Sequence, residues 1–151
     1  MVDFWRKDMD GGSEILGEAY LKLDPASAAK ARSHIRVWLG SDHPEYENAR
    51  LATSELVTNA VLHAFLRGPD ALILLTLTRR AGLLYVEVTD PGGGFWDPYA
   101  LPAMPDDEEG GRGLAIVGEV SRGRWGVRDR GRRGRTVWCA LGGDPDPAER
   151  P

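Results

Sequence analysis

The sequence predicts an α+β fold: a two-layer α/β sandwich in which helices cover one face of a mixed, mainly antiparallel sheet. Short segments that alternate apolar and polar residues occur in both halves of the chain and predict strands. Three other segments carry apolar residues at helical spacing. The resulting order is strand, helix, helix, strand, strand, long loop, helix, strand, strand, which is typical of helices packed on one side of a sheet.

The first half of the chain supplies one strand and two helices. Residues 14–23 partly alternate and predict an edge strand. Asp24 and Pro25 suit the start of a helix over 26–39, because aspartate caps helices and proline fits the first helical position. A second helix is predicted to begin near residue 42 or 44 and to run to residue 65.

The second half supplies a hairpin, a long loop and a final group of elements. Residues 72–78 and 83–89 are separated by a short turn and predict an antiparallel hairpin. Residues 91–112 are rich in proline and glycine and carry an acidic run, which indicates a functional loop or lid. The remaining predicted elements are a helix over 113–121 and strands over 124–128 and 135–141.

Length and composition favour one soluble domain. The chain has 151 residues, enough for one domain with a real core, which we place at 14–141 between tails at 1–13 and 142–151. The net charge of −4 argues against nucleic-acid binding, which usually requires a basic face. We find no run long enough for a membrane span, no signal peptide, and a single cysteine, so we expect a cytoplasmic protein.

A polar stripe on the second helix is the most informative motif. Glu55, Asn59 and His63 are spaced four residues apart and therefore lie on one side of the helix, among apolar neighbours. Burying these groups is costly unless something satisfies them. A cation with a polyphosphate would do so, because an amide oxygen suits Mg²⁺ and a carboxylate can act as a base. The helix alone favours the alternative, a solvent-facing stripe or an internally satisfied cluster.

Two glycine-rich segments could bind the rest of a nucleotide. Asp90 ends a strand and runs into residues 91–94, Pro-Gly-Gly-Gly, where its carboxylate could accept a hydrogen bond from an exocyclic amine; a capped tight turn is the alternative. Residues 110–114 lead into a helix, and such loops bind phosphate, although a lid hinge would look the same. No lysine follows Lys30, which excludes a P-loop, so Mg²⁺, backbone amides and Arg112 would hold the phosphates.

In this order, the motifs resemble those of the GHKL nucleotide-binding superfamily, which has the Bergerat fold and includes gyrase, histidine kinases and MutL. The chain is most similar to its small branch of anti-sigma factors and serine-protein kinases. Glu55 and Asn59 match the N-box of that superfamily. Residues 90–94 match the G1 box, residues 111–114 match the G2 box, and residues 134–137 resemble the last motif. The resemblance extends over about residues 14–141.

The resemblance implies a role for each matching residue. Asn59 would bind Mg²⁺ and Glu55 would be the general base. Asp90 would bind the adenine amino group, with support from Thr136. The other residues implied to contact the cofactor are Gly92 and Gly94, which would shape the base pocket, and the G2-box residues Gly111, Arg112, Gly113 and Leu114.

The resemblance also implies an activity and partners. Stand-alone domains of this branch bind ATP with Mg²⁺, phosphorylate a serine or threonine of a small anti-anti-sigma protein of the STAS type, and sequester a sigma factor. Homodimerisation is expected from the branch, and the first strand would offer an edge for it. Two alternatives remain: a module that captures a regulatory protein with ATP as a structural ligand, and a simple ATPase. The intact Glu55 favours catalysis over the first alternative.

Overall fold

The computed structural model describes residues 12–64, 71–90, 107–129 and 134–143. The elements follow the predicted order. They are β1 (Glu14–Lys22), α2 (Ser27–Leu39), α3 (Tyr46–Ala64), β2 (Leu72–Arg80), β3 (Leu83–Asp90), α4 (Asp107–Val120), β4 (Trp125–Asp129) and β5 (Arg135–Gly142). Most of each predicted tail and most of the predicted lid lie outside the described residues.

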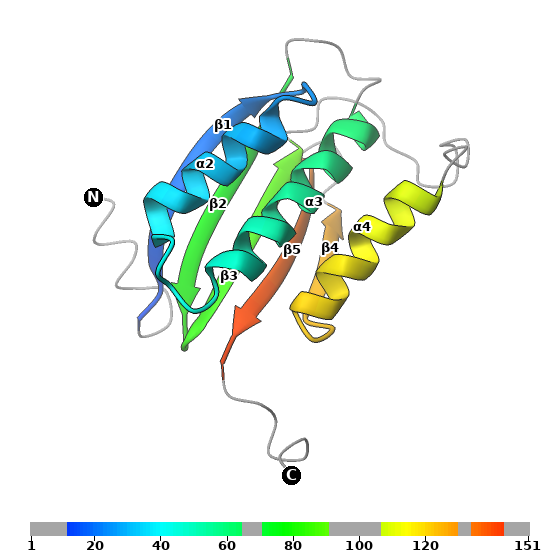
Figure 1. Cartoon of the computed structure of the whole chain (residues 1–151). Coiled ribbons are helices and arrows are strands. Elements are labelled where there is room, and N and C mark those ends of the chain that lie inside the picture. Colours follow the sequence, from blue (N-terminus) through cyan, green and yellow to red (C-terminus); the bar gives the residue numbers. More distant parts are fainter. Residues whose placement is uncertain (1–11, 65–70, 91–106, 130–133, 144–151) are drawn as a thin grey trace.

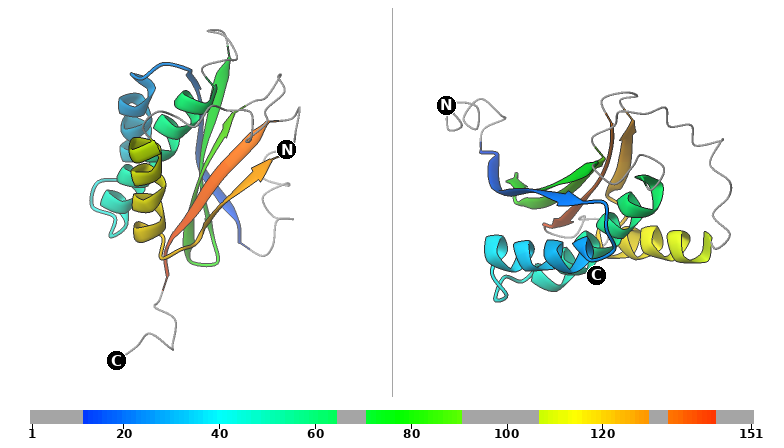
Figure 2. Two further views of the ribbon diagram at one scale, coloured as in Figure 1. Left: turned by 90° about the vertical axis from the view of Figure 1, so that its right-hand side faces the viewer. Right: turned by 90° about the horizontal axis from the view of Figure 1, so that it is seen from above.

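The strands form one five-stranded sheet in the order β1-β2-β3-β5-β4. All four pairings between neighbouring strands are antiparallel. The three helices lie side by side on one face of this sheet, with α3 between α2 and α4 (Figure 1), and the side view separates the two layers (Figure 2). The predicted two-layer α+β sandwich is therefore confirmed.

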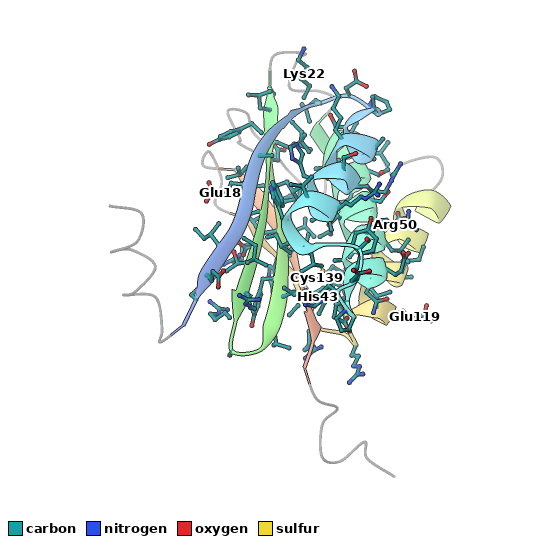
Figure 3. All side chains as sticks on the ribbon, turned by 60° about the vertical axis from the view of Figure 1, so that its left-hand side comes forward. Glu18, Lys22, His43, Arg50, Glu119 and Cys139 are labelled. Carbon is teal, nitrogen blue, oxygen red and sulfur yellow. The ribbon has the colours of Figure 1, made fainter. Side chains whose placement is uncertain are left out.

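The sheet has an inner face, which packs on the helices, and an outer face. In β2, Ile73, Leu75 and Leu77 are fully buried on the inner face, whereas Thr76 and Thr78 alternate with them on the outer face. Figure 3 shows Cys139 between sheet and helices and Glu18 pointing away from the helices. Burial raises the pKa of the Cys139 thiol to about 12, as expected for a core residue that stays protonated.

Helix α3 lies close to the sheet because its inward side is built partly from small residues. Ala49, Ala52 and Ala60 are buried together with Leu56. The helix contacts both other helices and the inner face of β3 and β5. Its polar stripe is therefore held against the body of the protein, beside α4 and the sheet.

One glycine in β1 makes room for the largest side chain of α2. A Cβ atom on Gly17 would lie 2.1 Å from Cδ2 of Trp38, so only glycine permits this packing. Gly17 also follows a register shift between β1 and β2. The predicted helix end at Gly40 is confirmed, with a φ of 89° and an N–H that donates to the Arg36 carbonyl.

The last helix differs from the prediction. It begins at Asp107, six residues before the predicted start at Gly113, so the glycines expected in a phosphate-binding loop lie within α4. The glycines of this segment favoured a loop in the sequence, whereas the helix runs through their positions. Among the described residues, no helix is both long and apolar enough to cross a membrane.

Candidate functional site

The polar stripe of α3 faces α4 and Arg135, the first residue of β5. Asn59 is buried, with 6% of its surface exposed, while Glu55 and His63 are half-buried. The two ends of the stripe have different neighbours: Glu55 meets α4, and Asn59 meets a residue of β5. The solvent-facing alternative is therefore wrong for Asn59.

Glu55 contacts the backbone of α4 at a glycine. A Cβ atom added to Gly113 would lie 2.7 Å from Oε2 of Glu55, closer than side chains normally pack. The carboxylate can therefore rest directly over this turn of α4 only because residue 113 lacks a side chain. The structure thus brings together one residue of the N-box and one of the G2 box, which lie 58 positions apart in the sequence.

A second group of polar residues lies at the ends of β3 and β5. Asp90 and Arg135 are cross-strand partners and are 3% and 6% exposed. Strand alternation places both on the inner face, with Val88 and Val137 of the core. Nη2 of Arg135 donates to Oδ1 of Asn59 across 3.5 Å, which is a long hydrogen bond. Polar residues of α3 and of the sheet therefore form one buried polar cluster, which consists of Asn59, His63, Asp90 and Arg135.

The electrostatic environment of His63 indicates that it belongs to this cluster. Burial lowers the pKa of His63 below its ordinary value, the Arg135 guanidinium lowers it further, and the Asp90 carboxylate opposes them. The imidazole is therefore neutral at pH 7. Because both charges act on it, His63 lies close to the point where Asp90 and Arg135 face each other.

The structure does not bring Thr136 together with Asp90. The hydroxyl of Thr136 lies 2.8 Å from that of its cross-strand partner Thr89, on the outer face. Because successive side chains in a strand point to opposite faces, the residue beside Asp90 is Arg135. The side chain that shares the inner face with Asp90 is therefore that of Arg135, and the support of Asp90 expected from Thr136 is not seen in the described structure.

The structure describes only some of the remaining predicted site residues. Gly92 and Gly94 lie outside the described residues. Gly111 and Arg112 are part of α4, of which only the backbone is described at these positions. Leu114 is half-buried and packs against the hydrophobic core.

Arg135 is the cluster residue whose role the sequence reasoning missed. The signal was present in the alternation of β5, where Val137, Cys139 and Leu141 are core residues. Counting back by two places Arg135 on the same inner face, so a charged residue stands where a core residue would be expected.

Comparison with known families adds to this geometry. The family model described as histidine kinase-like ATPase domain matches residues 21–139. The chain belongs to this family. As a member of a family of ATPase domains, it is an ATP-binding protein, and the match covers every described element that contributes to the polar cluster.

Two curated relatives are similar over a shorter region. Both are named anti-sigma F factor, from Clostridium botulinum strain Alaska E43 / Type E3 and strain Eklund 17B / Type B. Each is 30% identical to this histidine kinase-like ATPase domain over 78 residues, which cover 48% of this chain and 54% of the relative. The chain thus spans about half the length of the curated relatives it matches.

The donor atoms of the cluster suit a magnesium ion that is shared with a nucleotide. Mg²⁺ is usually held by one or two protein oxygens together with substrate phosphates. The amide oxygen of Asn59 is a ligand of this type, and it is buried at the centre of the cluster. Within the described part of the chain, no three histidine, cysteine or acidic residues gather as a metal site.

The outer face of the sheet carries a separate groove of about 750 Å³. Its described lining includes Tyr85, Glu87, Arg128 and Trp138, and none of the predicted site residues of this histidine kinase-like ATPase domain. Arg128 forms an ion pair with Glu87 across this groove. Since these charges pair on the exposed outer face, the groove gives no comparable indication of a nucleotide site.

Proposed function

We propose that the chain binds ATP with Mg²⁺ at the buried polar cluster and transfers the terminal phosphoryl group to a serine or threonine of a small anti-anti-sigma protein. The observation that carries this proposal is the contact between Glu55 and the backbone at Gly113, one helical turn from the buried Asn59. A carboxylate, an amide oxygen and a glycine-bearing helix thus lie together, in a chain that belongs to an ATPase-domain family.

Glu55 would act as the general base. Its carboxylate would accept the proton of the substrate hydroxyl as the hydroxyl oxygen bonds to the terminal phosphorus of ATP. The bond from this phosphorus to the bridging oxygen breaks, and ADP leaves. Asn59 would hold Mg²⁺, which when bound supplies positive charge to the transferring phosphoryl group.

Asp90 would recognise the base. It is 3% exposed and lies on the inner face at the end of β3, where a buried carboxylate acts only as a hydrogen-bond acceptor when ionised. The exocyclic amine of adenine is a matching donor. A base that carries a carbonyl oxygen at this position would place two acceptors against each other.

The partner in this proposal rests on the relatives. Two proteins named anti-sigma F factor are similar to about half of this chain. We therefore propose a sigma factor as a second partner and an anti-anti-sigma protein of the STAS type as the phosphate acceptor. We also propose a homodimer. In the described structure strand β1 lies at one edge of the sheet, and an edge strand can pair with another strand.

The test is phosphate transfer from labelled ATP to a purified STAS-type protein. We expect Glu55→Gln to reduce labelling by about 10²- to 10⁴-fold, because it removes the base. The matched control is Glu47→Gln on the same helix, where Glu47 is exposed and pairs only with Arg50 in the described structure. This control should label the partner as the wild type does.

The other outcomes separate the alternatives. Release of phosphate to water without labelling of the protein would indicate a simple ATPase. Binding of ATP with neither reaction would indicate a module that uses ATP as a structural ligand. Equal labelling by Glu55→Gln and the wild type would remove Glu55 from the mechanism.

A further inference from the structure

Arg135 brings a positive charge to the oxygen that the proposed function assigns to Mg²⁺. Its Nη2 lies 3.5 Å from Oδ1 of Asn59, and each residue is 6% exposed. This hydrogen bond joins the C-terminal half of α3 to the first residue of β5. The metal ligand and the guanidinium therefore share one buried space.

A magnesium ion and this guanidinium oppose each other. An amide oxygen has two lone pairs, so it can in principle bind a metal and accept a hydrogen bond together. Two positive charges on the same buried oxygen nevertheless repel, because little solvent is present to screen them. Arginine cannot relieve the repulsion by losing a proton, since its pKa lies far above the physiological range. The guanidinium therefore opposes binding of the ion unless it moves away.

Asp90 explains how the protein tolerates the buried charge of Arg135. It faces Arg135 directly across the β3–β5 pairing, on the same face, and it is also buried. A carboxylate in this position offsets the guanidinium charge. Both groups also act on His63, which confirms that they lie in one electrostatic environment.

We propose that Arg135 sets the magnesium requirement of the nucleotide site. Its guanidinium donates to Oδ1 of Asn59, and Mg²⁺ would bind this oxygen well only when the guanidinium is displaced. Arg135 thereby weakens the apparent affinity of the site for Mg²⁺. The ion then binds only when the phosphates of the nucleotide supply negative charge that offsets the guanidinium. This inference rests on the proposed function, because it requires ATP and Mg²⁺ to bind at this cluster.

The experiment measures ATP binding by calorimetry over a series of Mg²⁺ concentrations, using the full chain. We expect Arg135→Gln to lower the Mg²⁺ concentration at half-maximal binding by at least about tenfold, because it removes the competing charge but keeps a donor. Arg128→Gln is the matched control: it removes an arginine from β4 on the outer face, where Arg128 pairs with Glu87. Its Mg²⁺ midpoint should equal that of the wild type.

A second variant protects the test against loss of folding. Arg135→Met keeps an unbranched side chain without a charge. Like Arg135→Gln, it leaves the buried carboxylate of Asp90 without its cross-strand guanidinium, so both variants are expected to be less stable than the wild type. It should shift the Mg²⁺ midpoint in the same direction as Arg135→Gln. Thermal unfolding without ATP verifies that each variant is folded.

The two ways to fail are distinct. If the wild type and the folded Arg135 variants bind ATP with the same Mg²⁺ midpoint, the inference is overturned and the proposed function stands. If none of them binds ATP at any Mg²⁺ concentration, the proposed function fails and the inference falls with it.

Discussion

Each face of the sheet brings an arginine opposite a carboxylate, but the exposure of the two pairs differs. On the outer face, Arg128 pairs with Glu87 across β5, and their side chains are 46% and 30% exposed. On the inner face, Asp90 and Arg135 face each other with only 3% and 6% exposure. An exposed pair of this kind contributes about 0–1 kcal/mol, whereas a buried charge costs several kcal/mol of desolvation. The inner pair is therefore the one that indicates a binding site.

The largest expected effect comes from removing the carboxylate that faces Arg135 on the inner face. Asp90→Asn leaves the guanidinium of Arg135 buried without its cross-strand carboxylate, so we expect the free energy of unfolding to fall by about 3–5 kcal/mol. Glu87→Gln on the outer face should change it by less than about 1 kcal/mol. Urea denaturation of both variants measures this contrast, and equal losses would show that burial does not distinguish the two pairs.

Two glycines give the next contrast, between a packing position and a site position. Gly17→Ala should lower the free energy of unfolding by about 1–3 kcal/mol or more, because its Cβ would lie 2.1 Å from Trp38. Gly113→Ala meets only the flexible end of Glu55 at 2.7 Å, and alanine is favoured over glycine in a helix by about 1 kcal/mol.

We therefore expect Gly113→Ala to keep its stability and to lose phosphate transfer, because the displaced Glu55 carboxylate leaves its position over α4. Thermal unfolding and the labelling assay measure the two properties on the same sample. A variant that keeps full transfer would mean that the contact between Glu55 and Gly113 is unimportant for catalysis.

The smallest expected effect is a pH dependence from His63. Its pKa in the folded protein lies below the ordinary value of 6.5, so below this pH the unfolded chain binds more protons than the folded one. The free energy of unfolding should therefore decrease as the pH falls from 7 toward the folded pKa, and this contribution should level off below it. His63→Gln removes this loss, so urea titrations of both proteins at several pH values should diverge in that window. Parallel profiles would show that His63 does not sense the cluster.

Much of the fold could be predicted because the patterns are local. Alternation identified the strands, and helical spacing identified α2 and α3 to within a few residues. The glycines of α4 favour a loop, so they could not predict where the helix begins. Only the residues at the ends of the segment distinguish a helix from a loop.

The site was predicted less completely. The resemblance implied that Thr136 supports Asp90, whereas strand alternation places Arg135 on the face of Asp90 and Thr136 on the opposite face. The meeting of Glu55 with Gly113, and of Asn59 with Arg135, depends on how α3 packs between α4 and the sheet. No local sequence pattern encodes that packing.

The central claim is that the buried cluster binds ATP with Mg²⁺, and calorimetry on one pair of variants tests it most directly. Asn59→Ala removes the buried amide, whereas Asn48→Ala removes a half-buried amide of the same helix that donates to Glu45. We predict that the wild type and Asn48→Ala bind ATP equally, and that Asn59→Ala weakens binding by at least about tenfold, or about 1.4 kcal/mol. Equal binding by all three proteins, or no binding by the wild type, would contradict the claim.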